Sequence, residues 1–140
     1  MPDLSARLRA AVEALPLAPG LRVVEIGCGP GAAAREVARR VGPDGHVLAV
    51  DRSASAIAQV RTTAADLIAA GRLSARCCTA EELTLEPGEE PYDLAFAVRV
   101  GAFDGRHPVA GEHARARLVE VLGPDARFFV DGVEQVLRRP

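Results

Sequence analysis

The sequence predicts an α/β fold with a doubly wound, mostly parallel sheet of about five strands and helices on both faces. Short apolar runs alternate with amphipathic segments of ten or more residues, which is the pattern of βαβ units. A glycine-rich turn separates the first such run from the segment after it. The chain has 140 residues, of which 49% are hydrophobic and 26% charged. A chain of this size suits one core, so we expect a single domain over residues 1–140.

The first elements lead into the glycine-rich turn. Residues 3–15 place apolar side chains at three- and four-residue intervals, which predicts an amphipathic helix that ends at Pro16. Residues 21–26, LRVVEI, predict a buried strand. Residues 32–41 predict a helix, which ends at the glycine and proline residues of 42–45.

The middle of the chain repeats the alternation. Residues 46–51, HVLAVD, predict the second strand. Ser53 can cap a helix over residues 54–70, and Gly71 ends that helix. Residues 73–78, LSARCC, predict the third strand.

The C-terminal part adds two strands with a helix between them. Residues 92–98, YDLAFAV, and 126–131, ARFFVD, predict strands, and a helix is expected near residues 112–122. Residues 84–91, TLEPGEEP, predict an exposed acidic turn. Parallel sheets of this kind bind ligands at the carboxyl ends of their strands. We therefore expect a site there, formed by residues 27–31, 51, 79–82, 99–107 and 131.

Composition excludes several classes of function. The formal net charge is -2, so no overall basic field attracts nucleic acid or anionic membrane. We find no signal peptide and no apolar run of about 20 residues, so we expect a cytoplasmic protein that does not enter a membrane. Cys28, Cys77 and Cys78 lack metal-ligand spacing, so we expect reduced thiols and no metal site.

Three glycines mark the turn after the first strand. Gly27, Gly29 and Gly31 leave room for a ligand to approach backbone N–H groups at the start of a helix. Gly27, Gly29 and Ala32 also satisfy G-x-G-x-x-A, so a nicotinamide dinucleotide is an alternative ligand.

Two carboxylates restrict the ligand further. Glu25 lies two residues before the first glycine, where it would repel a pyrophosphate but suits a ligand that carries an ammonium group. Asp51 ends the second strand and is placed to accept hydrogen bonds from two ribose hydroxyls. A nucleoside joined to a cationic amino acid would satisfy both carboxylates.

Four stretches in order resemble the motifs of class I S-adenosylmethionine-dependent methyltransferases. They are VVEIGCGPG, VLAVDRS, CCTAEEL and YDLAFAV, which together span roughly residues 21–100. The resemblance implies a Rossmann-like fold and S-adenosylmethionine as the cofactor. It also implies the following cofactor-binding residues: Glu25, Gly27, Cys28, Gly29, Gly31, Asp51, Arg52, Ala80, Glu81, Val98 and Arg99.

The resemblance gives these residues roles. The glycine loop would pass along the methionine part of the cofactor, and Asp51 would bind ribose. Arg52, Ala80 and Glu81 would form the adenine wall. Val98 and Arg99 would border the methyl group.

The sequence departs from the family pattern in three places. Thr79 occupies a position that is commonly acidic, and no Asn-Pro-Pro-Tyr follows the fourth strand, which argues against enzymes that methylate nucleic-acid amino groups. Family members also usually continue into a further helix and an antiparallel strand pair, which this 140-residue sequence does not contain. Without them the fifth strand would be a sheet edge, so we expect two chains to associate near residues 126–137 as a homodimer. The alternative is that residues 132–140 form one short strand or about two helical turns that cover this strand in part.

No motif identifies a catalytic base. His107 and His113 follow the fourth strand, and either is a candidate to accept a proton from a methylated hydroxyl. The alternative is that both are ordinary exposed histidines. A sulfonium is already a good leaving group, so positioning can supply much of the catalysis and a base is optional.

Three functions remain open at this stage. The first is a methyltransferase that acts on a small-molecule acceptor. The second is a non-catalytic S-adenosylmethionine-binding or interaction module with a degenerate substrate site. The third is an NAD-binding oxidoreductase domain, which would keep the sheet and change the ligand.

Overall fold

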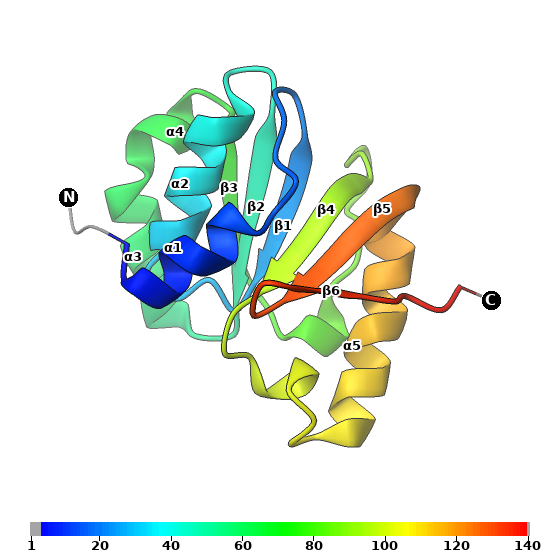
Figure 1. Ribbon diagram of the computed structural model, residues 1–140. Coiled ribbons are helices and arrows are strands. Elements are labelled where there is room, and N and C mark those ends of the chain that lie inside the picture. The colour runs from blue at the N-terminus through cyan, green and yellow to red at the C-terminus, as the bar shows by residue number, and fades with distance from the viewer. Residues whose placement is uncertain (1–3, 140) are drawn as a thin grey trace.

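A computed structural model describes residues 4–139, which form one mixed sheet with helices on both faces (Figure 1). The strand order is β3-β2-β1-β4-β5-β6. Strands β1 to β5 are parallel, and β6 is antiparallel to β5. This arrangement confirms the predicted fold class. The strands are β1 (Arg22–Ile26), β2 (His46–Asp51), β3 (Leu73–Cys77), β4 (Tyr92–Ala97), β5 (Leu122–Val130) and β6 (Val133–Gln135).

The helices divide between the two faces of the sheet (Figure 1). They are α1 (Ala6–Glu13), α2 (Ala32–Val41), α3 (Ala54–Thr63), α4 (Ala65–Ala69) and α5 (Pro108–Val121), with short 3₁₀ turns η1 (Ala80–Glu82) and η2 (Gly101–Phe103). Helices α1 to α4 pack on one face, while α5 and η1 pack on the other. No helix within residues 4–139 combines the length and the apolar character that a membrane crossing requires.

Strand alternation explains how both faces become buried. Val23 and Phe96 belong to the core beneath α2, whereas Val24 and Ala95 belong to the core beneath α5. Successive side chains of a strand point to opposite faces. Because helices cover both sides, the central strands are apolar throughout and show no polar alternation.

Several predicted boundaries agree with the structure, and others need correction. The helix over residues 32–41 and the strand over residues 46–51 have the predicted bounds. Ser53 caps α3, where its side chain accepts a hydrogen bond from the Ala56 N–H at 3.2 Å. The helix predicted over residues 54–70 is instead interrupted at Ala64, whose φ of -110° and ψ of 21° are not helical.

The elements at the C-terminal end begin earlier than predicted. Helix α5 starts at Pro108 rather than near residue 112. Proline suits the first helical position, because its fixed φ is helical and its missing N–H would have no helical partner there. Strand β5 starts at Leu122 rather than at residue 126. Leu122 pairs with Tyr92 of β4, and the register between the two strands shifts after this pair.

The expected open edge at residues 126–131 is wrong. Strand β6 pairs with β5 through Phe128 with Gln135, Phe129 with Glu134 and Val130 with Val133. The Arg127 guanidinium also donates two hydrogen bonds of 2.8 Å to Glu134. A segment beyond the fifth strand therefore supplies the partner, and the argument for chain association near residues 126–137 loses its premise.

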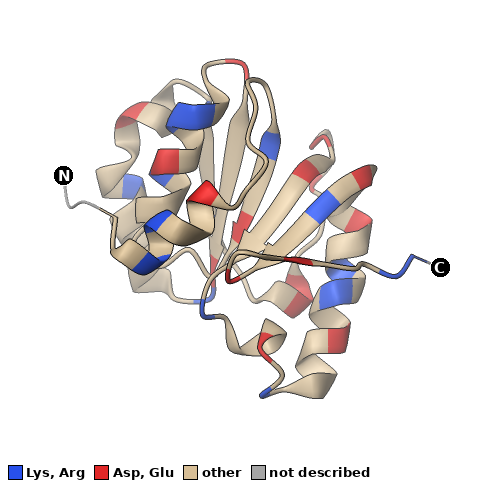
Figure 2. Ribbon diagram, in the orientation of Figure 1, with Lys and Arg blue, Asp and Glu red and all other residues tan. Residues whose placement is uncertain are grey.

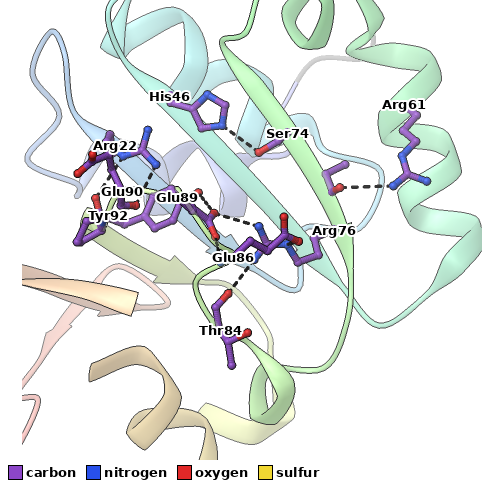
Figure 3. Close-up of polar contacts among 12 residues, drawn as sticks. Arg22, His46, Arg61, Ser74, Arg76, Thr84, Glu86, Glu89, Glu90 and Tyr92 are labelled. Atoms are coloured by element: carbon purple, nitrogen blue, oxygen red, sulfur yellow. Dashed lines mark hydrogen bonds and ion pairs between the residues drawn. The ribbon is translucent and has the colours of Figure 1, made fainter. Parts of the chain in front are cut away.

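The acidic turn is anchored to the sheet at one glutamate (Figure 3). The Tyr92 hydroxyl donates to Glu89 Oε2 at 2.5 Å, and Arg76 Nη2 donates to the same oxygen at 3.0 Å. Burial acts to raise the pKa of Glu89, but these hydrogen bonds and one from the Glu86 N–H hold the pKa below its usual value. The turn is thus exposed along most of its length and fixed at Glu89.

We expect Tyr92→Phe to lower the free energy of unfolding by about 1.5–3 kcal/mol, the range for a hydrogen bond to a charged acceptor. The ring, which lies 4.7 Å from the Arg22 guanidinium, is retained in this variant. Urea denaturation measures the change. Glu86→Gln is the matched control, because the exposed Glu86–Arg76 ion pair should contribute less than about 1 kcal/mol. Equal stability of Tyr92→Phe and the parent chain would contradict the prediction.

Candidate functional site

A cavity of about 550 Å³ lies at the carboxyl ends of β1 and β2, where the predicted site was expected. Its wall continues through the segment after β3 and the segment between β4 and α5. Six of the predicted cofactor-binding residues line it: Gly27, Asp51, Arg52, Ala80, Glu81 and Arg99. Segments that are distant in the sequence thus meet at one end of the sheet.

The glycine loop turns beside this cavity with its backbone fixed by β2. The N–H groups of Gly27 and Cys28 donate to the Val50 carbonyl at 2.7 and 2.9 Å. Gly27 has φ of 73°, and a Cβ there would lie 2.5 Å from Val100 Cγ2. Gly29 has φ of 53° and open space where its Cβ would be. Both positions favour glycine for their backbone conformation, and Gly27 also for its close contact.

Asp51 connects the glycine loop to the start of α3. Its Oδ2 accepts a hydrogen bond from the Gly29 N–H at 2.9 Å, and its Oδ1 accepts one from the Ser53 N–H at 2.8 Å. The side chain lines the cavity. An ionised carboxylate has about four acceptor positions, so Asp51 can accept further hydrogen bonds from a ligand.

Glu25 lies behind the loop and does not line the cavity. Its side chain is 2% exposed, and its Oε1 has no hydrogen-bond partner within the described residues. Burial, assisted by the negative charge of Asp51, raises the pKa of Glu25 to about 8. The backbone N–H of Ala34 at the start of α2 acts in the opposite direction. A cation near the loop would favour the charged form, so the buried carboxyl fits a cationic ligand.

Four further residues of the prediction are not part of the cavity wall: Cys28, Gly29, Gly31 and Val98. Cys28 is buried, and its pKa is raised by burial and by the charges of Glu25 and Asp51. This thiol is therefore not an activated nucleophile. Gly31 is the residue that precedes α2, and Val98 is buried at the end of β4.

The two candidate histidines lie in different places. His107 lines the cavity, whereas His113 is exposed on α5 and is not part of the wall. Only His107 is close to where a substrate could enter.

The far wall contains residues that the motifs did not indicate. Val100, Gly101, Ala102 and Arg106 line the cavity from the segment between β4 and α5. Their place after the fourth strand was the available signal, because parallel sheets bind ligands at the carboxyl ends of their strands. Thr79 also lines the cavity, and its backbone N–H and hydroxyl donate to Glu82 at 3.0 and 2.9 Å.

The described residues contain no group of three or more His, Cys, Asp or Glu side chains that could hold a metal ion.

Comparisons with known proteins agree with this geometry. A family model described as "Methyltransferase domain" matches residues 23–125. No curated protein matches the sequence. A solved S-adenosylmethionine-dependent methyltransferase from Mesorhizobium loti is 25% identical with a TM-score of 0.69, and the match covers 89% of this chain and 53% of that protein.

Two further structures share the fold. An S-adenosylmethionine-dependent methyltransferase from Aquifex aeolicus is 17% identical with a TM-score of 0.70, over 89% of this chain and 62% of that one. PKMT2 from Rickettsia typhi, in complex with AdoHcy, is 21% identical with a TM-score of 0.64, over 89% of this chain and 24% of that one. The chain spans less than two thirds of each protein. Since the family model covers well over half of the chain, the chain belongs to the methyltransferase-domain family, as its motifs predicted.

Proposed function

We propose that this chain binds S-adenosylmethionine and transfers its methyl group to a small-molecule acceptor. The observation that carries the proposal is the cavity at the strand ends, where Gly27, Asp51 and Glu81 come together in a methyltransferase-domain chain. A structural relative was solved with AdoHcy, the demethylated form of that cofactor. Residues 1–140 would act as one cofactor-binding domain.

The residues around the cavity suit the parts of this cofactor. The remaining acceptor positions of Asp51 would bind the ribose hydroxyls. Ala80 and Glu81, on the turn after β3, would lie beside the adenine with Arg52. Glu25 would stabilise the ammonium group from behind the loop, through water or loop N–H groups. S-adenosylmethionine supplies an activated methyl group on a sulfonium.

The segment after β4 would border the acceptor. Val98 and Arg99 follow β4 at the position where the family places the methyl group. His107 lines the same wall and is the candidate to hold a proton released by an acceptor hydroxyl. Orientation of the acceptor by this wall would supply much of the rate.

Two alternatives have different support. A non-catalytic binding module would have the same cofactor cavity and would differ only in lacking methyl turnover. An NAD-binding domain is disfavoured, because β6 is antiparallel where dinucleotide folds continue with parallel strands.

Calorimetric titration of the purified chain with S-adenosylmethionine, S-adenosylhomocysteine and NAD tests the proposed cofactor. We expect the first two to bind and NAD to fail. Methyl turnover with a panel of small acceptors then separates an enzyme from a binding module. Binding of NAD alone would overturn the proposal.

We expect Asp51→Ala to weaken S-adenosylhomocysteine binding by about 1.5–3 kcal/mol, because the variant loses a charged acceptor for the ribose. Calorimetry measures the dissociation constant. Ser53→Ala is the control, since it removes the α3 cap at a cost of about 1 kcal/mol in stability and leaves the Asp51 carboxylate in place. An unchanged dissociation constant in folded Asp51→Ala would remove Asp51 from the site.

We expect S-adenosylhomocysteine to bind more tightly as pH rises from about 6 to about 8. The free protein holds the Glu25 proton up to a pKa of about 8, whereas the ligand ammonium favours the carboxylate. Binding below that pKa therefore releases a proton, and affinity rises by up to about tenfold per pH unit. Calorimetric titrations in buffers of different ionisation enthalpy measure the number of protons released on binding.

Glu25→Gln is the matched variant for the pH series, because it keeps the shape of the side chain and cannot ionise. Its affinity should be weaker near pH 8 and nearly independent of pH below it. The same slope in parent and variant would show that Glu25 does not act on the ligand.

A further inference from the structure

The charged residues of the cavity wall are unevenly distributed. Asp51, Arg52 and Glu81 lie at the end formed by β2 and the turn after β3, where the acidic side chains outnumber the basic one. Arg99, Arg106 and His107 all lie on the segment that joins β4 to α5. Figure 2 shows basic positions along this connection, below the ends of the strands. The cavity therefore has an acidic end, assigned above to the nucleoside, and a basic end.

Arg99 is held at the basic end by an unusual backbone conformation. Its φ is 57°, and its backbone N–H donates to Asp131 Oδ1 at 2.9 Å. A non-glycine residue in this region costs of order 1–3 kcal/mol, which surrounding contacts must offset. Within residues 4–139 the Arg99 guanidinium has neither an ion pair nor a hydrogen bond. The nearby carboxylate of Asp131 accepts the Arg99 backbone N–H and forms its ion pair with Arg7, at 3.6 Å.

Arg106 and His107 converge on Gly101. A Cβ at Gly101 would lie 3.3 Å from Arg106 Nη2 and 3.2 Å from His107 Cδ2. The Nε of Arg106 donates to Asp104 Oδ2 at 2.7 Å, which orients the guanidinium. The absence of a side chain at Gly101 thus leaves room for a cationic and an imidazole group beside the same point of the wall.

The acidic residues do not neutralise this end. Asp104 compensates the charge of Arg106 and is not part of the cavity wall. Asp51 already accepts two backbone N–H groups at the opposite end. Arg99 therefore remains as an uncompensated positive charge, with Arg106 and His107 as further hydrogen-bond donors.

We propose that the methyl acceptor carries an anionic oxygen group, a carboxylate or a phosphate, which Arg99 and Arg106 bind beside Gly101. This inference rests on the proposed function, because it assigns the acidic end to the cofactor. Guanidinium groups bind carboxylate and phosphate oxygens with charge-assisted hydrogen bonds. With a net charge of -2 the protein has no overall attraction for a polyanion, which favours a small anion as the ligand.

Matched probes test the acceptor charge on protein saturated with S-adenosylhomocysteine. Lactate and lactamide differ in charge at nearly constant shape, and glycerol phosphate and glycerol test the phosphate arm. Binding is followed by nuclear magnetic resonance titration. We expect the anionic member of at least one pair to bind about tenfold more tightly, the effect of one charge-assisted hydrogen bond. The arm with the larger preference identifies the group.

Variants test which residue causes the preference for the anionic probe. Arg99→Gln should reduce it to about threefold or less, whereas Arg99→Lys should keep most of it, because the charge remains. Arg117→Gln on α5 makes the same charge change away from the cavity wall and should leave the preference intact. Arg117→Gln should also bind S-adenosylhomocysteine as the parent does, and each Arg99 variant is titrated with the probes at an S-adenosylhomocysteine concentration that saturates it.

The outcomes separate the two proposals. If S-adenosylhomocysteine fails to bind the parent chain, the proposed function fails. If it binds but the anionic probes show no preference, or Arg99→Gln leaves the preference unchanged, only the anionic acceptor is overturned.

Discussion

The carboxylate of Asp51 is the interaction on which the candidate site depends. It bonds the backbone of Gly29 on one side and of Ser53 on the other, so one side chain sets the distance between the glycine loop and α3. The Val50 carbonyl, one residue earlier, accepts the N–H groups of Gly27 and Cys28. The end of β2 therefore organises the loop that follows β1. The same carboxylate thus holds both the glycine loop and Ser53, the residue that caps α3.

Glu25, in contrast, destabilises the same region. Its carboxyl is buried with one oxygen unpartnered, which in a protein of modest stability is a cost that packing alone does not explain. Protonation relieves the cost in the free protein, because the pKa is raised to about 8. A cation at the loop would relieve it differently, by favouring the charged form. The charge of a bound ligand would therefore change the protonation state of Glu25.

Local pattern predicted the elements whose signals are local. The helix over residues 32–41 and the strand over residues 46–51 are bounded by glycines and by the change from apolar to polar residues, and both were correct. Asp51 and Gly27 were found at the cavity because they belong to a motif with fixed spacing. The segment from Arg99 to His107 was expected at the site from its place after the fourth strand, and much of it lines the cavity. The residues after the fifth strand were long enough for one short strand, but three residues carry little periodic signal, so the pairing of β6 with β5 was not predicted.

The basic end of the cavity is connected to the last strand pair through Asp131. This residue has φ of 49°, its N–H donates to the Ala97 carbonyl at 2.9 Å, and its carboxylate accepts the Arg99 N–H. It also begins the turn between β5 and β6 and pairs with Arg7, just beyond the wall. Two left-handed residues, one after each of two adjacent strands, thus support each other's conformation. The backbone conformation of Arg99 is therefore supported by the β5–β6 turn, so this end of the cavity depends on the same antiparallel pairing that covers β5.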